Sequence, residues 1–280
     1  MFRLLFLAVL AFGTVWIYTI PVPHQLTVSF LDVGQGDAIF IEGPTGTQLL
    51  IDGGATRGVL RSVRKVMPFF DRSIDAVVAT HPDQDHIGGL AHVLGRYAVQ
   101  HFFEPGNSSQ TPASLRLREA LQEKGMKPIP ARRGMRLLLG GGAYADVLFP
   151  DRDVSTAESN TASVVMRVVY GETAFLLTGD SPQSIEKYLV SLEPLASGKS
   201  GLKSNVLKAG HHGSKTSSAE IFLETVNPDV VVISAGKDNR YGHPHQTVVE
   251  AIKSRGIGLR STALEGTVLF TSNGETISIQ

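Results

Sequence analysis

The sequence predicts an α+β protein in which two β-sheets pack face to face with helices on the outside, an αββα sandwich. Strand-like and helix-like segments alternate from residue 26 to residue 280. The strands form two series, which begin near residues 26 and 135 and follow a similar order. A hydrophobic content of 42% in a chain of 280 residues is ample for a buried core. Interleaved strands and helices in two such series favour two sheets with outer helices.

The first hydrophobic segment differs from the rest, because residues 4–20 contain no charged side chain. As a helix it would be about 25 Å long, slightly less than a hydrocarbon core of about 30 Å. Arg3 precedes it, so the positive-inside rule leaves the amino end in the cytoplasm and the domain outside. No small-residue cleavage site follows, which favours a single-pass anchor in the cell membrane over a signal peptide cleaved from a secreted protein. A buried first helix is the third alternative.

We therefore assign residues 1–23 to an anchor or signal segment and residues 24–280 to the folded domain. Pro21 and Pro23 end the hydrophobic segment. The domain then opens with predicted strands at 26–31, 38–41 and 48–51, separated by glycine-rich turns that are typical of antiparallel hairpins. A helix over 58–70, a strand over 74–79 and helices over 89–96 and 114–124 complete the first series.

The second series begins near residue 135 with predicted strands at 145–149, 163–170 and 174–178. It continues with the strand 205–208, the helix 218–226, the strand 230–234 and the helix 246–253. A final hairpin is expected around 272–274, where Ser, Asn and Gly form the turn. The Ser- and Gly-containing stretch 194–201 is the segment that we expect to be a flexible loop.

Metal-ligand side chains are concentrated directly after the predicted strand 74–79. The loop holds His81, Asp83, Asp85 and His86, and Gly88 and Gly89 then allow a close turn into a helix. Imidazole nitrogens together with carboxylate oxygens suit divalent first-row metal ions, and alternate residues of an extended loop can face one point. Although a solvated polar loop is the alternative, four ligand types followed by two glycines favour a metal site.

Other polar residues follow or precede predicted strands, where loops meet at one edge of a sheet. Asp180 follows the strand 174–178 and could bridge two ions through its two oxygens, with a turn aspartate as the alternative. His211 and His212 follow the strand 205–208 between glycines, and we expect one to bind metal and the other to contact substrate.

Two further histidines, His243 and His245, lie in the loop after the strand 230–234. They are candidates for contact with substrate or for proton transfer, although capping of the next helix is an alternative role. Asn160, just before the strand 163–170, is a candidate neutral group beside the metal ions or an ordinary turn residue.

Composition excludes several classes of function. The chain has no cysteine, which excludes disulfides, thiolate zinc ligands and a cysteine nucleophile. Lys plus Arg and Asp plus Glu are 26 each, so bulk charge gives no attraction to nucleic acid or anionic lipid. The chain lacks a basic stripe and has one Trp, so neither an electrostatic track nor an aromatic stacking surface for nucleic acid is visible.

These motifs resemble the metallo-β-lactamase-fold hydrolases. Residues 81–86 with Asp180 and His211 are similar to the HxHxDH signature, the bridging aspartate and the later histidine of that superfamily. The chain is closer still to the hydrolase module of the ComEC competence proteins, which the following segments resemble in order: 30–38, 49–54, 160–163, 176–180, 211–214 and 241–245. ComEC proteins are large membrane proteins with a channel region, whereas one hydrophobic segment precedes the module here. DNA transport is therefore not implied.

The resemblance implies an αββα sandwich of the metallo-β-lactamase type over 24–280 with two divalent metal ions. One ion would be held by His81, Asp83 and Asp180, and the other by Asp85, His86, Asp180 and His211. Asp83 and Asn160 stand where the wider superfamily has histidines. Because oxygen donors in place of imidazoles make the first site more suitable for hard metal ions, we favour manganese, with zinc as the alternative. The same departures disfavour a β-lactam hydrolase.

The implied activity is hydrolysis of phosphodiester bonds by a hydroxide that two metal ions activate, as in a phosphodiesterase or nuclease. His212, His243 or His245 would supply a proton to the leaving group, Lys208 would supply a cation, and Asp52 would support the ligand loop from behind. Single-stranded DNA is one candidate substrate, residues 4–20 would contact the membrane, and no protein partner is evident. An esterase or lactonase and a non-catalytic binding module of a membrane assembly are the alternatives.

Overall fold

The computed structural model describes residues 25–193 and 201–280. The predicted hydrophobic segment 4–20 and most of the predicted loop 194–201 lie outside these residues. None of the helices in the two described ranges combines the length and the apolar character that crossing a membrane requires.

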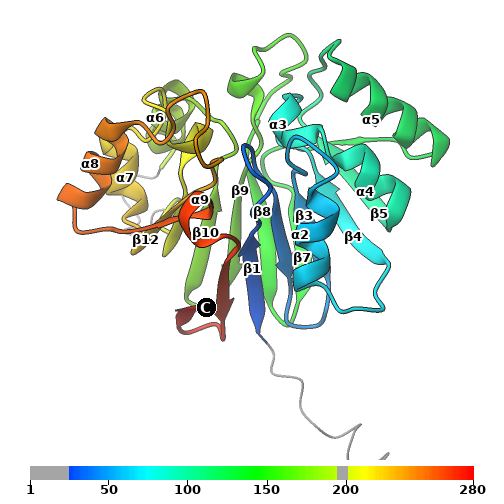
Figure 1. Cartoon of the computed structure of the whole chain (residues 1–280). Coiled ribbons are helices and arrows are strands. Elements are labelled where there is room, and N and C mark those ends of the chain that lie inside the picture. The colour runs from blue at the N-terminus through cyan, green and yellow to red at the C-terminus, as the bar shows by residue number, and fades with distance from the viewer. Residues whose placement is uncertain (1–24, 194–200) are drawn as a thin grey trace, which may run out of the picture.

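Two β-sheets form the centre of the molecule and pack against one another (Figure 1). The first sheet has eight strands in the order β15 (Ile277–Ile279), β14 (Val268–Ser272), β1 (Leu26–Phe30), β2 (Ile39–Glu42), β3 (Gln48–Ile51), β4 (Ser73–Val78), β5 (Ala98–Glu104) and β6 (Ile129–Pro130). The second sheet has seven strands in the order β13 (Gly258–Ser261), β12 (Val230–Ile233), β11 (Val206–Lys208), β10 (Thr173–Leu177), β9 (Val165–Tyr170), β8 (Ala143–Phe149) and β7 (Arg136–Gly140).

The two sheets share a strand pattern, as their similar order in the sequence predicts. In the first sheet β1, β2 and β3 are antiparallel, and β4, β5 and β6 then follow β3 in parallel. In the second sheet β7 to β10 are antiparallel, and β11, β12 and β13 follow β10 in parallel. The parallel strands therefore end at one edge of each sheet, which is where connecting loops can bring ligands together.

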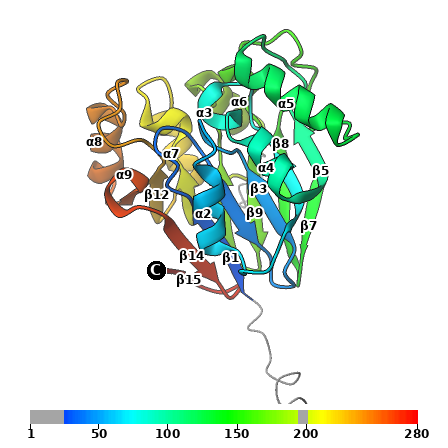
Figure 2. The same cartoon turned by 45° about the vertical axis from the view of Figure 1, so that its right-hand side comes forward.

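Helices cover the outer face of each sheet (Figures 1 and 2). The first sheet is flanked by α2 (Val59–Val66), α3 (Gln84–Ile87), α4 (Leu90–Arg96) and α5 (Pro112–Glu123). The second sheet is flanked by α6 (Gln183–Ser191), α7 (Glu220–Val226) and α8 (Gln246–Ser254), while the short α9 (Thr262–Glu265) follows β13. Two 3-10 turns, η1 (Asn160–Ala162) and η2 (Gly210–Gly213), lie in loops at the ends of strands.

Three apolar clusters account for these layers. The cluster between the sheets contains Phe30, Phe175 and Phe270, whose rings meet edge to face at centroid distances of 5.7 and 5.9 Å. Alternation along β3 links two clusters, because Leu49 and Ile51 face the other sheet while Leu50 faces the helices. A third cluster packs α6, α7 and α8 on the second sheet. The αββα sandwich predicted from the sequence is confirmed.

The predicted elements differ from the structure mainly where burial is uneven. The sequence analysis did not identify β5, β7, β13 or α6, and it extended the first helix to residue 70, whereas α2 ends at Val66. Met67 is extended because Pro68 disfavours helical backbone in the residue before it. In β5 the first residues are largely exposed and the last are buried, so this strand lacks the alternation that marks a half-buried strand.

Candidate metal centre

Loops from distant parts of the chain meet at one end of the sandwich, beside α3 in Figure 1. The loop after β4 supplies His81 and leads into α3 with His86. The loop after β10 supplies Asp180, and η2 after β11 supplies His211 and His212. These are the strand-end positions that the sequence analysis selected, and their side chains lie next to one another.

Asp180 lies at the middle of the cluster. Its Oδ2 is 3.3 Å from His86 Nε2, 3.4 Å from His212 Nε2 and 3.9 Å from His81 Nε2. The carboxylate is almost fully buried, and its backbone N–H donates to Ser163 Oγ at 3.2 Å. Three imidazole nitrogens thus point at one carboxylate oxygen.

The two adjacent histidines of η2 have different environments. His212 is buried, and its Nδ1 donates to the Ser234 carbonyl at 2.8 Å, so its Nε2 faces Asp180 and lies 3.3 Å from Asp85 Oδ2. The side chain of His211 is 29% exposed, and its Nε2 is 3.9 Å from Asp180 Oδ2. The buried position therefore belongs to His212, whereas the residues alone left the choice between the two histidines open and the resemblance implied His211 as the metal ligand.

Both histidines have left-handed backbone conformations, with φ of 48° for His211 and 56° for His212. Each such conformation costs about 1–2 kcal/mol for a residue with a side chain. This strain is typical of functional sites, where surrounding contacts hold the backbone in place. The left-handed backbone allows a short loop to direct two successive imidazoles toward the same cluster.

Asp52 supports the cluster from behind. His86 Nδ1 donates to Asp52 Oδ2 at 2.8 Å, and the same carboxylate accepts the Thr80 N–H at 2.8 Å and the Thr80 hydroxyl at 2.7 Å. These bonds fix the ring of His86 so that its Nε2 faces Asp180. The predicted position of Asp52 behind the ligand loop is confirmed.

A buried ion pair borders the cluster, and the sequence analysis did not identify its acidic member. Lys208, at the end of β11, is fully buried and forms an ion pair with Asp37, which precedes β2. Its Nζ also donates to the Gly179 carbonyl at 2.9 Å and lies 3.5 Å from Asp180 Oδ1. Lys208 therefore neutralises buried carboxylates. The sequence did contain an indication of this pair, because Lys208 ends an apolar strand and a buried ammonium group requires an acidic partner.

Asp83 and Asp85 lie on the more open side of the cluster. The side chain of Asp83 is 43% exposed; its Oδ1 accepts from Ser159 Oγ at 2.6 Å and its Oδ2 is 3.6 Å from His81 Nε2. The Asp85 side chain is 26% exposed. Both carboxylates thus face the buried imidazoles on one side and solvent on the other, where a substrate can enter.

Buried polar atoms at the centre lack hydrogen-bond partners within the described residues. They are His81 Nε2, His86 Nε2, His212 Nε2 and Asp180 Oδ1. Leaving such atoms unpaired is costly, so each requires an explanation. Single ligand atoms of Asp37, His86, Asp180 and His212 all lie within 4.8 Å of one another. Because two ligands at roughly 2.1 Å from one ion are at most about 4.2 Å apart, this mixed nitrogen and oxygen set fits a divalent cation after small adjustments.

The protonation of the metal-free cluster follows from its carboxylates. Burial would lower the pKa of His212, but Asp180 and Asp37 outweigh it and raise the pKa to about 9. Burial likewise opposes protonation of His86, yet Asp180 and Asp52 raise its pKa well above the usual value. For Asp180 burial is outweighed by His212, His86 and Lys208, which hold its pKa well below the usual range. The imidazoles thus carry positive charge that a bound cation would replace.

The remaining predicted site residues lie around this centre. Asn160 opens η1, and its Oδ1 is buried without a hydrogen-bond partner in the described chain. The ring of His243 lies 5.4 Å from that of His211, and burial, with smaller electrostatic contributions from His211 and His212, lowers the His243 pKa. His245 is the N-cap of α8, where its side chain accepts the Thr247 N–H. The helix-capping alternative therefore describes His245.

Comparisons with known proteins agree with this geometry. Residues 31–237 match the family described as the metallo-beta-lactamase superfamily. ComE operon protein 3 of Bacillus subtilis is 31% identical over 87% of this chain and 32% of its own length. Recombination protein 2 of Haemophilus influenzae is 31% identical over 90% of this chain and 30% of its own. Competence protein ComA of Neisseria gonorrhoeae is 31% identical over 88% of this chain and 32% of its own.

The chain thus spans about a third of the length of these curated relatives. Among solved structures, the diiron β-hydroxylase CmlA from Streptomyces venezuelae superimposes with a TM-score of 0.55. The match covers 89% of this chain and 54% of CmlA at 16% sequence identity. At this identity the match bears on the fold alone.

Proposed function

From the premise that this chain belongs to the metallo-β-lactamase superfamily and is a metal-dependent hydrolase similar to the ComEC-type proteins, we propose that it cleaves phosphodiester bonds. The observation that carries the proposal is the convergence of unpaired buried nitrogens of His81, His86 and His212 on the carboxylate of Asp180. The carboxylates of Asp83, Asp85 and Asp180 among the candidate ligands suit hard divalent ions, which also bind phosphoryl oxygens.

The residues divide into two groups that could each hold one ion on either side of Asp180. His81 and Asp83 lie on one side, and His86, His212 and Asp85 lie on the other. We place His212 rather than His211 in the second group because His212 occupies the buried position. Oxygen donors from three aspartates favour manganese over zinc.

When bound, divalent ions would lower the pKa of water and polarise a phosphoryl oxygen. The protein side chains then have three tasks. Asp52 keeps His86 in one orientation through the 2.8 Å hydrogen bond between them. Asp83 and Asp85 stand at the open side, where they border the entering substrate. His211 and His243 lie beside them as predominantly neutral imidazoles, because burial lowers the pKa of both, and they can relay a proton toward the leaving group.

The names of the relatives support a nucleic-acid phosphodiester as one candidate substrate, since two of them are a recombination protein and a competence protein. Formal net charge is zero, so attraction of an anionic strand must come from the metal centre itself. We also propose that residues 4–20 anchor the chain in a membrane, because they carry no charge, and that the hydrolase domain lies outside the cytoplasm, because Arg3 precedes them.

The proposal is tested by hydrolysis of bis(p-nitrophenyl) phosphate by the purified chain with Mn²⁺, compared with Asp85→Ala. Asp85 contacts His212 in the cluster, so its loss should reduce kcat/KM by at least about a hundredfold. The matched control is Glu275→Ala, which removes an exposed carboxylate from the turn between β14 and β15 at the opposite end of the domain. Full activity of Asp85→Ala, or cleavage of p-nitrophenyl acetate without any phosphodiester cleavage, would overturn the proposal.

A further inference from the structure

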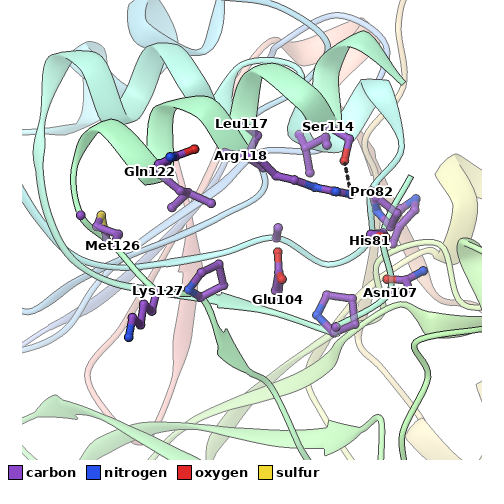
Figure 3. A pocket seen from close by; sticks show the side chains of 18 residues that line it. His81, Pro82, Glu104, Asn107, Ser114, Leu117, Arg118, Gln122, Met126 and Lys127 are labelled. Carbon is purple, nitrogen blue, oxygen red and sulfur yellow. Dashed lines mark hydrogen bonds between the residues drawn. The ribbon is translucent and has the colours of Figure 1, made fainter. Parts of the chain in front are cut away.

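A cavity of about 590 Å³ adjoins the candidate metal centre. It lies between α5 and the loop that follows β5, and His81 and Pro82 form its inner wall (Figure 3). The ring of His81 therefore separates the cavity from Asp180, which is 3.9 Å from the His81 Nε2. A substrate held at the metal centre could extend into this space across Pro82.

The walls of the cavity combine an apolar surface with a few polar groups. Leu117, Leu121 and Met126 contribute the apolar surface. Glu104 rises from the end of β5 toward the middle of the cavity, and on the opposite side Arg118 extends along α5 toward Ser114 and Pro82 (Figure 3). This combination is typical of a small-molecule site, in which apolar walls give affinity and a few polar groups fix orientation.

Two residues that line the cavity carry oxygen acceptors without adequate partners. Asn107 is only 7% exposed, and its Oδ1 has no hydrogen-bond partner in the described chain. Glu104 is partly buried, burial raises the pKa of its carboxyl, and the cationic neighbour that opposes this shift is Arg118. Arg118 is itself engaged, since its guanidinium donates to the Ser109 carbonyl at 3.0 Å. The cavity thus presents acceptors that a ligand with N–H donors would satisfy.

We propose that this cavity binds the base of a nucleotide whose phosphate occupies the metal centre. The inference rests on the proposed phosphodiesterase function and specifies its substrate class. Glu104 and Asn107 would accept hydrogen bonds from an amino-bearing base, as carboxylates accept from the cytosine amino group. Leu117 and Met126 would contact its faces, and Arg118 would attract the next phosphate of a chain. Bases with an exocyclic amino group should therefore be preferred to thymine, which has none.

The test compares binding and turnover on the full chain. Nucleoside 5′-monophosphates of guanine, cytosine and thymine are titrated by calorimetry without metal, so this measurement does not require activity. The p-nitrophenyl esters of the same nucleotides and the base-free p-nitrophenyl methyl phosphate are then compared as substrates with Mn²⁺. We expect the guanine and cytosine compounds to have Kd and KM about tenfold below those of thymine, because hydrogen bonds to a carboxylate differ by this order.

The variants Glu104→Gln and Asn107→Ala should reduce this preference to about threefold or less, and this ratio between substrates of one variant does not depend on its overall activity. Glu119→Gln, on α5 but not lining the cavity, is the matched control and should keep the preference. Equal binding of all three nucleotides by the parent chain, or an unchanged preference in a folded Glu104→Gln, would overturn the proposal. Failure of every phosphodiester to react would instead count against the proposed function. The calorimetric titrations would still test whether the cavity binds the base of a nucleotide.

A second, independent feature lies at the opposite end of the domain. Phe69 and Phe70, in the loop between α2 and β4, are 59% and 88% exposed, and their rings meet edge to face at 5.0 Å. The guanidinium of Arg64 lies 5.1 Å from the centre of the Phe69 ring. Exposed cations surround this aromatic tip, and they are Arg61, Arg64, Lys65 and Arg72.

Strand register fixes where this tip lies. Thr27 pairs with Glu42, Glu42 pairs with Gln48, and Leu49 pairs with Ala76, so Asp75 is level with Thr27 across the sheet. Residues 69 and 70 come directly before β4, so they lie at the end of the sheet at which β1 begins. Figures 1 and 2 show the described chain beginning at this end, away from α3 and the metal centre.

We infer that the Phe69–Phe70 tip rests in the headgroup region of an anionic lipid bilayer. Only residues 21–24 separate the predicted membrane segment 4–20 from residue 25, and this distance is at most about 18 Å for an extended chain. Aromatic side chains flanked by Lys and Arg are the groups that bind such an interface, through apolar insertion and attraction to anionic lipids. The metal centre would then face away from the membrane.

The absence of cysteine allows a direct test on the full chain. Phe70→Cys carries a polarity-sensitive fluorophore, and the matched control is Leu264→Cys on α9, where Leu264 is 84% exposed. In vesicles of phosphatidylcholine with phosphatidylglycerol the label at 70 should shift to the blue, and the label at 264 should not. The shift should be lost when Arg64 and Lys65 are changed to Glu. Equal spectra of the two labels in vesicles would overturn the inference. A shift of the label at 70 that occurs in detergent without vesicles and varies with protein concentration would also overturn it.

Discussion

Replacement of the buried lysine provides a stringent test of the electrostatic reasoning. In Lys208→Met the new side chain has a similar length but no charge, so Asp37, which is 1% exposed, loses its ion-pair partner. Asp180 and the Gly179 carbonyl lose the ammonium group that lies 3.5 and 2.9 Å away. Breaking a buried pair by removing one partner costs about 3–5 kcal/mol. For a domain of this size, that corresponds to a decrease in Tm of roughly 6–20 °C.

The assay is thermal unfolding at neutral pH in a chelating buffer, so that metal binding does not contribute. The double variant Asp37→Asn with Lys208→Met should regain much of the lost stability, because neither charge is then left buried alone. Arg136→Met is the control, since Arg136 pairs with Asp146 but is 51% exposed, and its loss should cost less than about 1 kcal/mol. A free energy of unfolding for Lys208→Met within about 1 kcal/mol of the parent chain would refute the reasoning.

Three further predictions concern the metal centre and its surroundings. The pKa of His212 is about 9, so its proton must leave before Nε2 binds metal, and the apparent affinity for Mn²⁺ should rise as the pH increases toward 9; calorimetric titrations that show no dependence on pH would contradict this. His245→Ala removes the N-cap of α8, so it should lower the free energy of unfolding by about 1 kcal/mol and leave kcat unchanged; a large fall in kcat with an unchanged melt would instead give His245 a role in the reaction. Gly36→Ala would place a Cβ 2.0 Å from the Asp85 carbonyl, at a φ of +119°, and should therefore displace the ligand loop and weaken Mn²⁺ binding at least about tenfold. Gly34→Ala, with φ of +78° and no atom within 4 Å of the added Cβ, is its control, and equal affinities for the two variants would show that the close approach does not matter.

The sequence was most informative where burial is regular. Central strands such as β3, buried along their whole length, and the hairpins of the first sheet follow directly from apolar runs and turn residues. The strand β5 and the helix α6 were not recognised. In β5 half of the strand faces solvent, while α6 begins directly after the loop of Asp180 with no side-chain cap to mark its start.

For the site, local spacing identified the residues at strand ends but not their depth. The sequence could not show that His212 lies inside and His211 outside, because the difference depends on two left-handed residues in η2. Asp37 was missed for another reason. Its contact with Lys208 joins residues far apart in the chain, and no local pattern reports such a pairing.

Anomalous diffraction from crystals of the chain grown with Mn²⁺ is the most direct measurement of whether these side chains form a metal centre. We expect a peak within about 2.5 Å of an Asp180 oxygen and of the Nε2 atoms of His86 and His212, with a second peak toward His81 and Asp83. An absence of Mn²⁺ from this cluster in an active protein, or ions bound only elsewhere on its surface, would contradict the account.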